Sequence, residues 1–402
     1  MKSARFWHPI LSLAVLLVGC GGNSTQPYLP VASSACVPAS NPEFAYVLTG
    51  YSVNMFTVNS CSGQFSMTTP AFVDTGYSYP QYENSEQMVA DPLGKFAYVA
   101  NLVSNVSGPS SISMYTINSA TGVLTPTTPA TVATGWFPQG IAIDPLGRFV
   151  YTANSDDGTV SMFTINQTTG VLTPATPASV PIQIPNSSIS SPGFLTVDPT
   201  GRFLYTATYL SNGAAVFMFS INQTTGVLTP TSPATVDTGG SPFQILVAPN
   251  DRFAYVVNNL SSSGESIGVW QYAVNSTTGV LTPNTPAAVD AGNAPTGIAV
   301  DPSSRFAYVV NRLDNTVSMY TIDQTSGNLT LNATATNQTG TIATGDIPFR
   351  IGFDPTGKYL YVTNEQSPAS IYTVNSDGTL TSAGVAGPET AGLSIAITAM
   401  GQ

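Results

Sequence analysis

Charged side chains are scarce in this chain of 402 residues, where they make up only 8% of the total. The only histidine is His8, close to the N-terminus, and there are three cysteines. Without a histidine in the body of the chain, a Ser-His-Asp triad, a histidine general base and a histidine metal site are all excluded there. No Cys-x-x-Cys pair occurs, so we expect neither a bound metal nor a cofactor.

The N-terminal residues have the order of a lipoprotein signal peptide. A basic segment with Lys2 and Arg5 precedes an apolar stretch that is shorter than the roughly 20 residues of a membrane-spanning helix. The stretch ends in Leu17-Val18-Gly19-Cys20, which resembles a bacterial lipobox, where cleavage precedes a cysteine that carries lipid. We therefore expect a signal peptide over 1–19, lipidation of Cys20, and a tether over 20–42.

This anchor predicts a protein outside the cytoplasm, and Gly21 favours the outer membrane because inner-membrane retention is associated with aspartate at that position. Cleavage removes two of the ten basic residues and none of the 21 acidic ones, which leaves a formal charge of −13. Such a chain repels nucleic acid and anionic headgroups. We expect no nucleic-acid partner, membrane contact through the lipid anchor only, and a monomer.

The two remaining cysteines are Cys36 in the tether and Cys61 in the body of the chain. In an oxidising compartment we expect a disulfide between them, and two free thiols are the alternative.

One phrase recurs along the rest of the chain, with an Asp-Pro turn, Tyr-Val-x-Asn, a loop, a β-branched run and Thr-Gly-Val-Leu-Thr-Pro. Its tyrosine returns every 50 to 54 residues, at Tyr46, Tyr98, Tyr151, Tyr205, Tyr255, Tyr308 and Tyr361. Each unit has four predicted strands that are apolar on both faces, so each sheet must lie between two others. The pattern predicts an all-β fold, a seven-bladed β-propeller of four-stranded antiparallel blades over 43–402.

The two ends of the repeat indicate a closed ring. The first unit begins at Phe44 and lacks its own innermost strand, whereas Ile395-Ala396-Ile397 follows a complete seventh unit. We expect this C-terminal strand to pair into the first blade and close the circle, which leaves no exposed sheet face at a seam.

The repeat also carries a family resemblance. Tyr361-Val362-Thr363-Asn364 spells the YVTN repeat, and Tyr98-Val99-Ala100-Asn101 is a close variant. Residues 43–398 resemble the YVTN and lactonase-like seven-bladed propellers, some of which hydrolyse 6-phosphogluconolactone while relatives act on muconate lactones. The resemblance implies the fold and, as an activity, lactone hydrolysis. For active members the resemblance implies a site with His, Arg and Glu, and this chain has no histidine beyond the signal peptide, so no catalytic residue is carried over.

Residues that depart from the repeat are the candidates for function. Six of the eight basic residues beyond the signal peptide fill one slot after the turn, and only Arg312 and Arg350 stand outside it. The position four residues before each turn aspartate should lie near the axis, and Arg350 occupies it in the last blade. We predict an axial ligand pocket formed by Arg350, Gln87, Gln244, Glu86, Phe194 and Arg312.

An arginine beside amides and an aromatic ring can hold a carboxylate, a phosphate or a sugar hydroxyl. The alternative is that Arg350 pairs with an acid such as Asp346 or Glu86 and has no further role. We therefore expect a binding or interaction scaffold at the cell envelope, with a small anionic or sugar-like ligand or an envelope protein as its partner. The alternative is a lactone hydrolase with an axial Arg and carboxylate, which the missing histidine disfavours. A surface protein serving adhesion is a third possibility.

Overall fold

The computed structural model describes residues 42–49, 51–76, 85–102, 110–182, 191–209, 214–260, 268–334, 337–387, 392 and 394–399. All of them belong to one compact unit that spans Pro38–Gln402. Within these ranges no helix has the length and apolarity needed to cross a membrane. The predicted signal peptide, Cys20 and Cys36 lie outside the described residues, so the anchor and the tether stay predictions.

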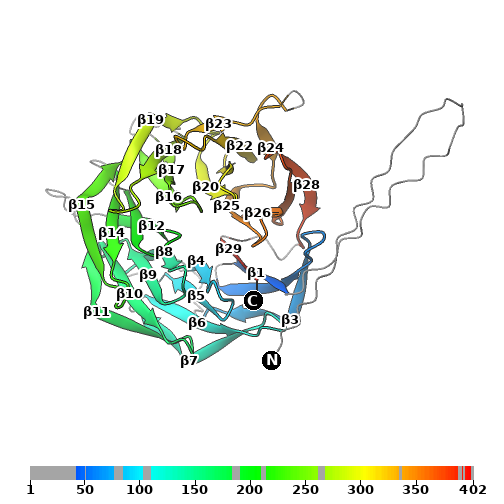
Figure 1. The fold of residues 1–402 in the computed structure, drawn as a ribbon. Coiled ribbons are helices and arrows are strands. Elements are labelled where there is room, and N and C mark those ends of the chain that lie inside the picture. The colour runs from blue at the N-terminus through cyan, green and yellow to red at the C-terminus, as the bar shows by residue number, and fades with distance from the viewer. Residues whose placement is uncertain are drawn as a thin grey trace, which may run out of the picture. The chain divides into compact units, whose positions relative to one another are not determined.

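Seven antiparallel sheets follow one another around a ring (Figure 1). Blade one contains β29 (Ser394–Ala399), β1 (Glu43–Leu48), β2 (Ser52–Val58) and β3 (Phe65–Asp74). Blade two contains β4 (Ser85–Ala90), β5 (Phe96–Asn101), β6 (Ser111–Ile117) and β7 (Leu124–Ala133). Blade three contains β8 (Pro138–Ile143), β9 (Phe149–Asn154), β10 (Thr159–Ile165) and β11 (Leu172–Pro181). Blade four contains β12 (Ser191–Val197), β13 (Phe203–Tyr209), β14 (Ala215–Ile221) and β15 (Leu228–Asp237).

The remaining three blades repeat this order, from an innermost to an outermost strand. Blade five contains β16 (Ser241–Val247), β17 (Phe253–Leu260), β18 (Val269–Val274) and β19 (Leu281–Val289). Blade six contains β20 (Pro295–Val300), β21 (Phe306–Asn311), β22 (Thr316–Ile322) and a divided outer edge, β23 (Leu329–Leu331) and β24 (Thr341–Ala343). Blade seven contains β25 (Pro348–Phe353), β26 (Tyr359–Asn364), β27 (Ser370–Val374) and β28 (Leu380–Val385).

The turn between the first two strands of a blade shows why the repeat phrase folds this way. In blade three, the Asp144 carbonyl accepts a hydrogen bond from the Gly147 N–H at 2.8 Å, and Gly147 has a φ of 64° that suits glycine. The Asp144 carboxylate accepts the backbone N–H of Phe149 at 2.8 Å and pairs with the Arg148 side chain. The basic residue of the repeat slot therefore supports the turn.

The hydrophobic core is divided among the interfaces between blades. Seven clusters of buried side chains each join two neighbouring blades, and the last joins blade seven to blade one. The repeat tyrosines cross the same interfaces, because each buried hydroxyl donates a hydrogen bond to a glycine carbonyl of the next blade. Tyr205 reaches Gly279 at 2.8 Å, and Tyr361 reaches Gly63 at 3.1 Å across the closure. The apolar side chains on both faces of each blade are therefore buried, each face against a neighbouring blade.

The C-terminal strand closes the ring, as the sequence predicts. Strand β29 pairs antiparallel with β1, in a register that runs from Glu43 opposite Ala399 to Leu48 opposite Ser394. The innermost strands contact one another in an unbroken circle in the order β29, β4, β8, β12, β16, β20, β25 and back to β29. The fold is therefore a closed seven-bladed β-propeller of antiparallel blades.

Candidate functional site

The innermost strands of blades two to seven each begin with an irregularity in pairing. In blade five, Pro242 lies opposite Asn258 and Gln244 opposite Val257, so Phe243 is an extra residue between them. Gln139 in β8 and Phe349 in β25 occupy the same extra position. Such a β-bulge re-aims side chains locally. We call the end of the ring where these strands begin the axial mouth.

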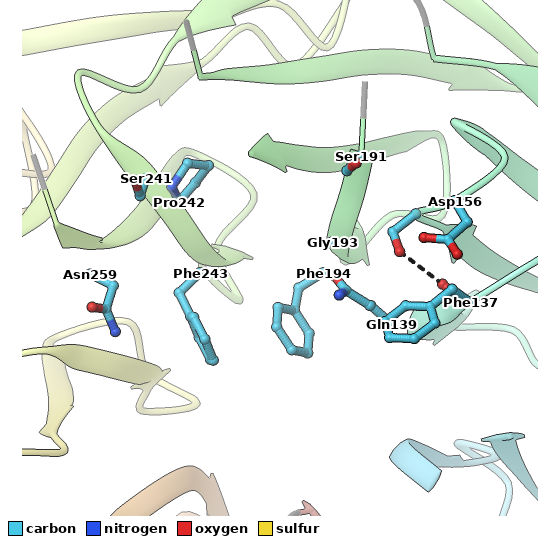
Figure 2. A pocket seen from close by; sticks show the side chains of 11 residues that line it. Phe137, Gln139, Asp156, Ser191, Gly193, Phe194, Ser241, Pro242, Phe243 and Asn259 are labelled. Atoms are coloured by element: carbon cyan, nitrogen blue, oxygen red, sulfur yellow. Dashed lines mark hydrogen bonds between the residues drawn. The ribbon is translucent and has the colours of Figure 1, made fainter. Parts of the chain in front are cut away.

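A pocket of about 510 Å³ opens at the axial mouth between the starts of β8, β12 and β16. Figure 2 shows Phe194 and Phe243 side by side at this pocket, and their ring centroids are 5.3 Å apart. Its lining contains both apolar and polar side chains. The lining residues are Phe137, Gln139, Ser155, Asp156, Ser191, Gly193, Phe194, Ser241, Pro242, Phe243 and Asn259.

Phe137 is held in the pocket wall by a constrained backbone. Its φ of 56° lies in the left-handed region that bulky residues rarely adopt. Its carbonyl accepts hydrogen bonds from the backbone N–H of Ser155 at 2.9 Å and from the Ser155 hydroxyl at 3.2 Å, the contact dashed in Figure 2. Ala294 and Ile347 also have a positive φ at the equivalent positions of their blades. The backbone conformation therefore belongs to the repeat, and blade three differs in having a phenylalanine there.

Arg350 lies against the aromatic wall and is only 7% exposed. Its guanidinium carbon is 4.0 Å from the ring centroid of Phe194, 4.3 Å from that of Phe349 and 5.0 Å from that of Phe243. These are cation–π distances, and burial strengthens such contacts. The Nη1 group donates a hydrogen bond to the Thr296 carbonyl at 3.1 Å. Arg350 is absent from the lining, but two of the rings that it contacts form the pocket wall.

The two predicted glutamines connect neighbouring blades. Oε1 of Gln87 accepts the backbone N–H of Ile141 at 3.0 Å, and Oε1 of Gln244 accepts that of Ile298 at 2.9 Å. Their amide oxygens thus join one innermost strand to the next, and a role in ligand binding stays a prediction. Glu86 is in β4, and its side chain lies outside the described part of the structure.

Arg312 forms an ion pair with Glu365 in the next blade. Its Nη2 donates to both carboxylate oxygens at 3.0 Å, and its Nε donates to one of them at 3.2 Å. Both residues directly follow the Tyr-Val-x-Asn phrase of their blades, the position that Ser155 and Asn259 fill at the pocket. The structure therefore places Arg312 at the same end of its blade as the pocket residues, with its charge matched by an acid.

Several pocket residues were not among the predicted ones. Phe243 and Gln139 were missed because the prediction counted one axial position per blade, whereas the bulge brings two successive residues to the mouth. Asn259 and Asp156 could have been found by comparing the residues that follow the Tyr-Val-x-Asn phrase among the seven units. Cys61 is disulfide-bonded, and the predicted partner Cys36 lies outside the described residues.

The chain belongs to the family described as lactonase, 7-bladed beta-propeller, which it matches over residues 37–187 and 214–391. It is similar to 6-phosphogluconolactonases of Serratia proteamaculans and Pectobacterium carotovorum, with 29% identity to each. These matches cover 47% of this chain and 55% and 54% of the relatives. The chain thus spans about half the length of the curated relatives it matches.

Solved structures share the fold. The periplasmic gluconolactonase of Pseudomonas aeruginosa superposes with a TM-score of 0.62 at 18% identity, over 87% of this chain and 98% of that one. A protein from Lactobacillus plantarum gives a TM-score of 0.64 at 19% identity, over 89% of this chain and 99% of that one. At such identities the likeness concerns the architecture alone.

These findings correct the expectation of a binding or interaction scaffold. The family and the relatives named 6-phosphogluconolactonase favour the alternative, a lactonase-type hydrolase. The expectation was wrong because it gave too much weight to the missing histidine. Ester hydrolysis needs a general base and donors for the oxyanion, and a carboxylate and side-chain amides can fill these roles.

Proposed function

We propose that this chain is a lactone hydrolase whose substrate binds in the pocket at the axial mouth. The observation that carries the proposal is this pocket, with its aromatic wall, amides and carboxylate, in a member of the lactonase family. Concave sites with a few convergent polar groups are typical of small-molecule binding. The relatives named 6-phosphogluconolactonase support the reaction class.

In the proposed reaction, water attacks the lactone carbonyl carbon, and the ring C–O bond then breaks to give a hydroxy acid. The Asp156 carboxylate, which lines the pocket, accepts the proton of the attacking water and returns it to the ring oxygen as the C–O bond breaks. The side-chain amide of Gln139, which lies on the same side of the paired rings as Asp156 in Figure 2, is an N–H donor for the carbonyl oxygen as it becomes negative. Phe194 and Phe243 form the surface against which the ring of the substrate lies.

Arg350 acts in this proposal as a positioning residue. Its buried charge is 4.0 to 5.0 Å from the centroids of the two pocket rings. Because Arg350 is absent from the pocket lining, its guanidinium contacts the rings of the wall rather than the substrate. Its contacts with Phe194, Phe243 and Phe349 also fix the wall of the pocket.

The test compares Asp156→Asn with the wild type on a panel of sugar and muconate lactones. Removal of a general base lowers the rate by about 100-fold or more, so we expect that loss in kcat/KM. Asp323→Asn is the matched control, because asparagine already fills this turn position in other blades, as at Asn222 and Asn275. An Asp156→Asn variant with wild-type turnover rules out the assigned base. If the wild type hydrolyses none of the lactones faster than water does, the proposed function is rejected.

We propose that the enzyme works outside the cytoplasm, held at the outer membrane by lipid on Cys20. The support is the order of basic residues, apolar stretch and lipobox-like Leu17-Val18-Gly19-Cys20. A small lactone is the only partner that this proposal requires.

A further inference from the structure

The charge of the pocket at the axial mouth limits which lactones it can accept. Asp156 is the only charged side chain among the lining residues that the structure describes, and it is negative. The remaining lining is aromatic, amide, hydroxyl or backbone. A phosphate group in this pocket would meet a carboxylate and no lysine or arginine.

The undescribed segments of the propeller cannot supply the missing cation. Every lysine and arginine beyond residue 5 stands at a position that the structure describes. The segments that adjoin the innermost strand or the second strand of blades four and five in the sequence, 183–190, 210–213 and 261–267, contain no basic residue, and the last contains Glu265. Any contribution of charge from these segments is therefore negative.

The eight cations of the propeller are all placed elsewhere. Six follow the turns between the first two strands, at the other end of those strands from the axial mouth: Lys95, Arg148, Arg202, Arg252, Arg305 and Lys358. Arg312 is held by the carboxylate of Glu365 at 3.0 Å. Arg350 is buried against three phenylalanine rings, and its Nη1 is directed to the Thr296 carbonyl.

We propose that the pocket selects uncharged lactones with an apolar ring face and disfavours phosphorylated ones. Recognition of a phosphate relies on arginine, lysine or a cluster of oriented backbone N–H groups. The paired rings of Phe194 and Phe243 instead offer an apolar surface, beside the amides of Gln139 and Asn259 for neutral hydroxyl groups. This inference rests on the proposed lactone hydrolase and names its substrate class.

The first measurement compares kcat/KM for glucono-δ-lactone and its 6-phosphate. We expect a preference of about tenfold or more for the uncharged ring, because a phosphate would lie beside Asp156 in a pocket without a cation. Raising the salt concentration should narrow this preference, since screening weakens the repulsion. A preference for the 6-phosphate overturns the inference and leaves lactone hydrolysis intact.

Asn259→Arg adds a cation to the pocket lining and should reduce the preference for the uncharged lactone several-fold. Thr229→Arg adds the same charge at an exposed position of β15, away from the pocket, and should leave the preference unchanged. Equal effects of the two substitutions would indicate a long-range influence of net charge and overturn the assignment to this pocket.

A binding measurement separates this inference from the proposed reaction. The unreactive lactam analogues of glucono-δ-lactone and its 6-phosphate are titrated into the protein by calorimetry. If neither lactone is hydrolysed, the proposed reaction fails, but tighter binding of the uncharged lactam still supports the selectivity. Equal binding of the two lactams, or none, overturns it.

Discussion

One buried tyrosine hydroxyl in each blade donates a hydrogen bond to the next blade, and the effect of its removal on stability should be measurable. The Tyr205 hydroxyl is buried and donates to the Gly279 carbonyl at 2.8 Å. Tyr205→Phe leaves that carbonyl without this donor, so we expect the free energy of unfolding to fall by about 1 to 2 kcal/mol. Denaturant unfolding checks the value, and Tyr51→Phe is the control because Tyr51 is 40% exposed. Equal stability of the two variants would contradict the assigned role.

Asp251 gives the protein a pH-dependent stability. Burial, and then the neighbouring carboxylate of Asp198, raise the pKa of Asp251 to about 6, and Arg202 partly opposes this. An aspartate in the unfolded chain titrates near pH 4, so between about pH 4 and 6 the folded state binds more protons than the unfolded state. The free energy of unfolding therefore falls as the pH rises through this window.

Asp251→Asn should remove this dependence. Asparagine tolerates the φ of 57° at this position, and the change ends the repulsion with Asp198. We expect a gain of about 1 kcal/mol at pH 8 and no gain at pH 4, where the folded protein already holds the proton. Thermal unfolding across this range tests the prediction, with the exposed Asp74→Asn as control. A gain that is the same at both pH values would contradict it.

At this scale the sequence could locate residues around the axial mouth, while their role in binding stays a prediction. Counting back from the turn aspartate placed Phe194 at the pocket wall and Arg350 behind it, because the repeat fixes one axial position in each blade. The same count missed Phe243, since a bulge adds a residue that no periodicity of two reveals. The count also could not show that Gln87 and Gln244 accept hydrogen bonds from the innermost strand of the next blade, because that contact depends on the spacing between blades.

Among the elements, strand β29 is the one that closes the ring. It is the innermost strand of blade one and pairs with β1 along its entire length. Deleting residues 390–402 would expose the edge of β1 and open the contacts of β29 with β25 and β4. We expect the truncated protein to unfold or aggregate, as judged by size-exclusion chromatography and thermal unfolding. A monomeric truncation with unchanged melting would show that the ring does not depend on this strand.

The elements were the most predictable part of the molecule. Strands that are apolar on both faces require cover on both sides, and the strand missing from the first unit, together with the extra strand after the seventh, identified the closure. The divided outer edge of blade six was not expected. There β23 and β24 both pair with β22, and the residues between them interrupt the edge strand. An outermost strand is paired on one side only, so an interruption there leaves the spacing of the repeat unchanged and is not visible in the sequence.

For the molecule as a whole, most of the basic side chains lie at the opposite end of the blades from the pocket. The turns at one end of the blades hold six of the propeller's eight cations, whereas the lining of the pocket at the axial mouth contains phenylalanine rings, amides and one carboxylate. The repeat accounts for the first arrangement, because the basic slot supports its turn, as Arg148 does with Asp144. The composition of the pocket lining, in contrast, comes from residues that depart from the repeat. A neutral substrate avoids the long-range repulsion that the chain's net charge of −11 imposes on anions.

Anchoring of the whole molecule is tested at Cys20. In cells, Cys20→Ser should abolish incorporation of radiolabelled fatty acid and move the protein from the membrane to the soluble fraction, because one thiol is the proposed site of attachment. Cys36→Ser is the matched control, since it changes a neighbouring cysteine and should leave both labelling and fractionation unaltered. Lactone turnover per molecule should be the same in the purified Cys20→Ser variant, because the pocket residues all lie within the propeller. Fatty-acid labelling that survives in Cys20→Ser would contradict the lipobox interpretation, and would leave the assignment of the pocket unaffected.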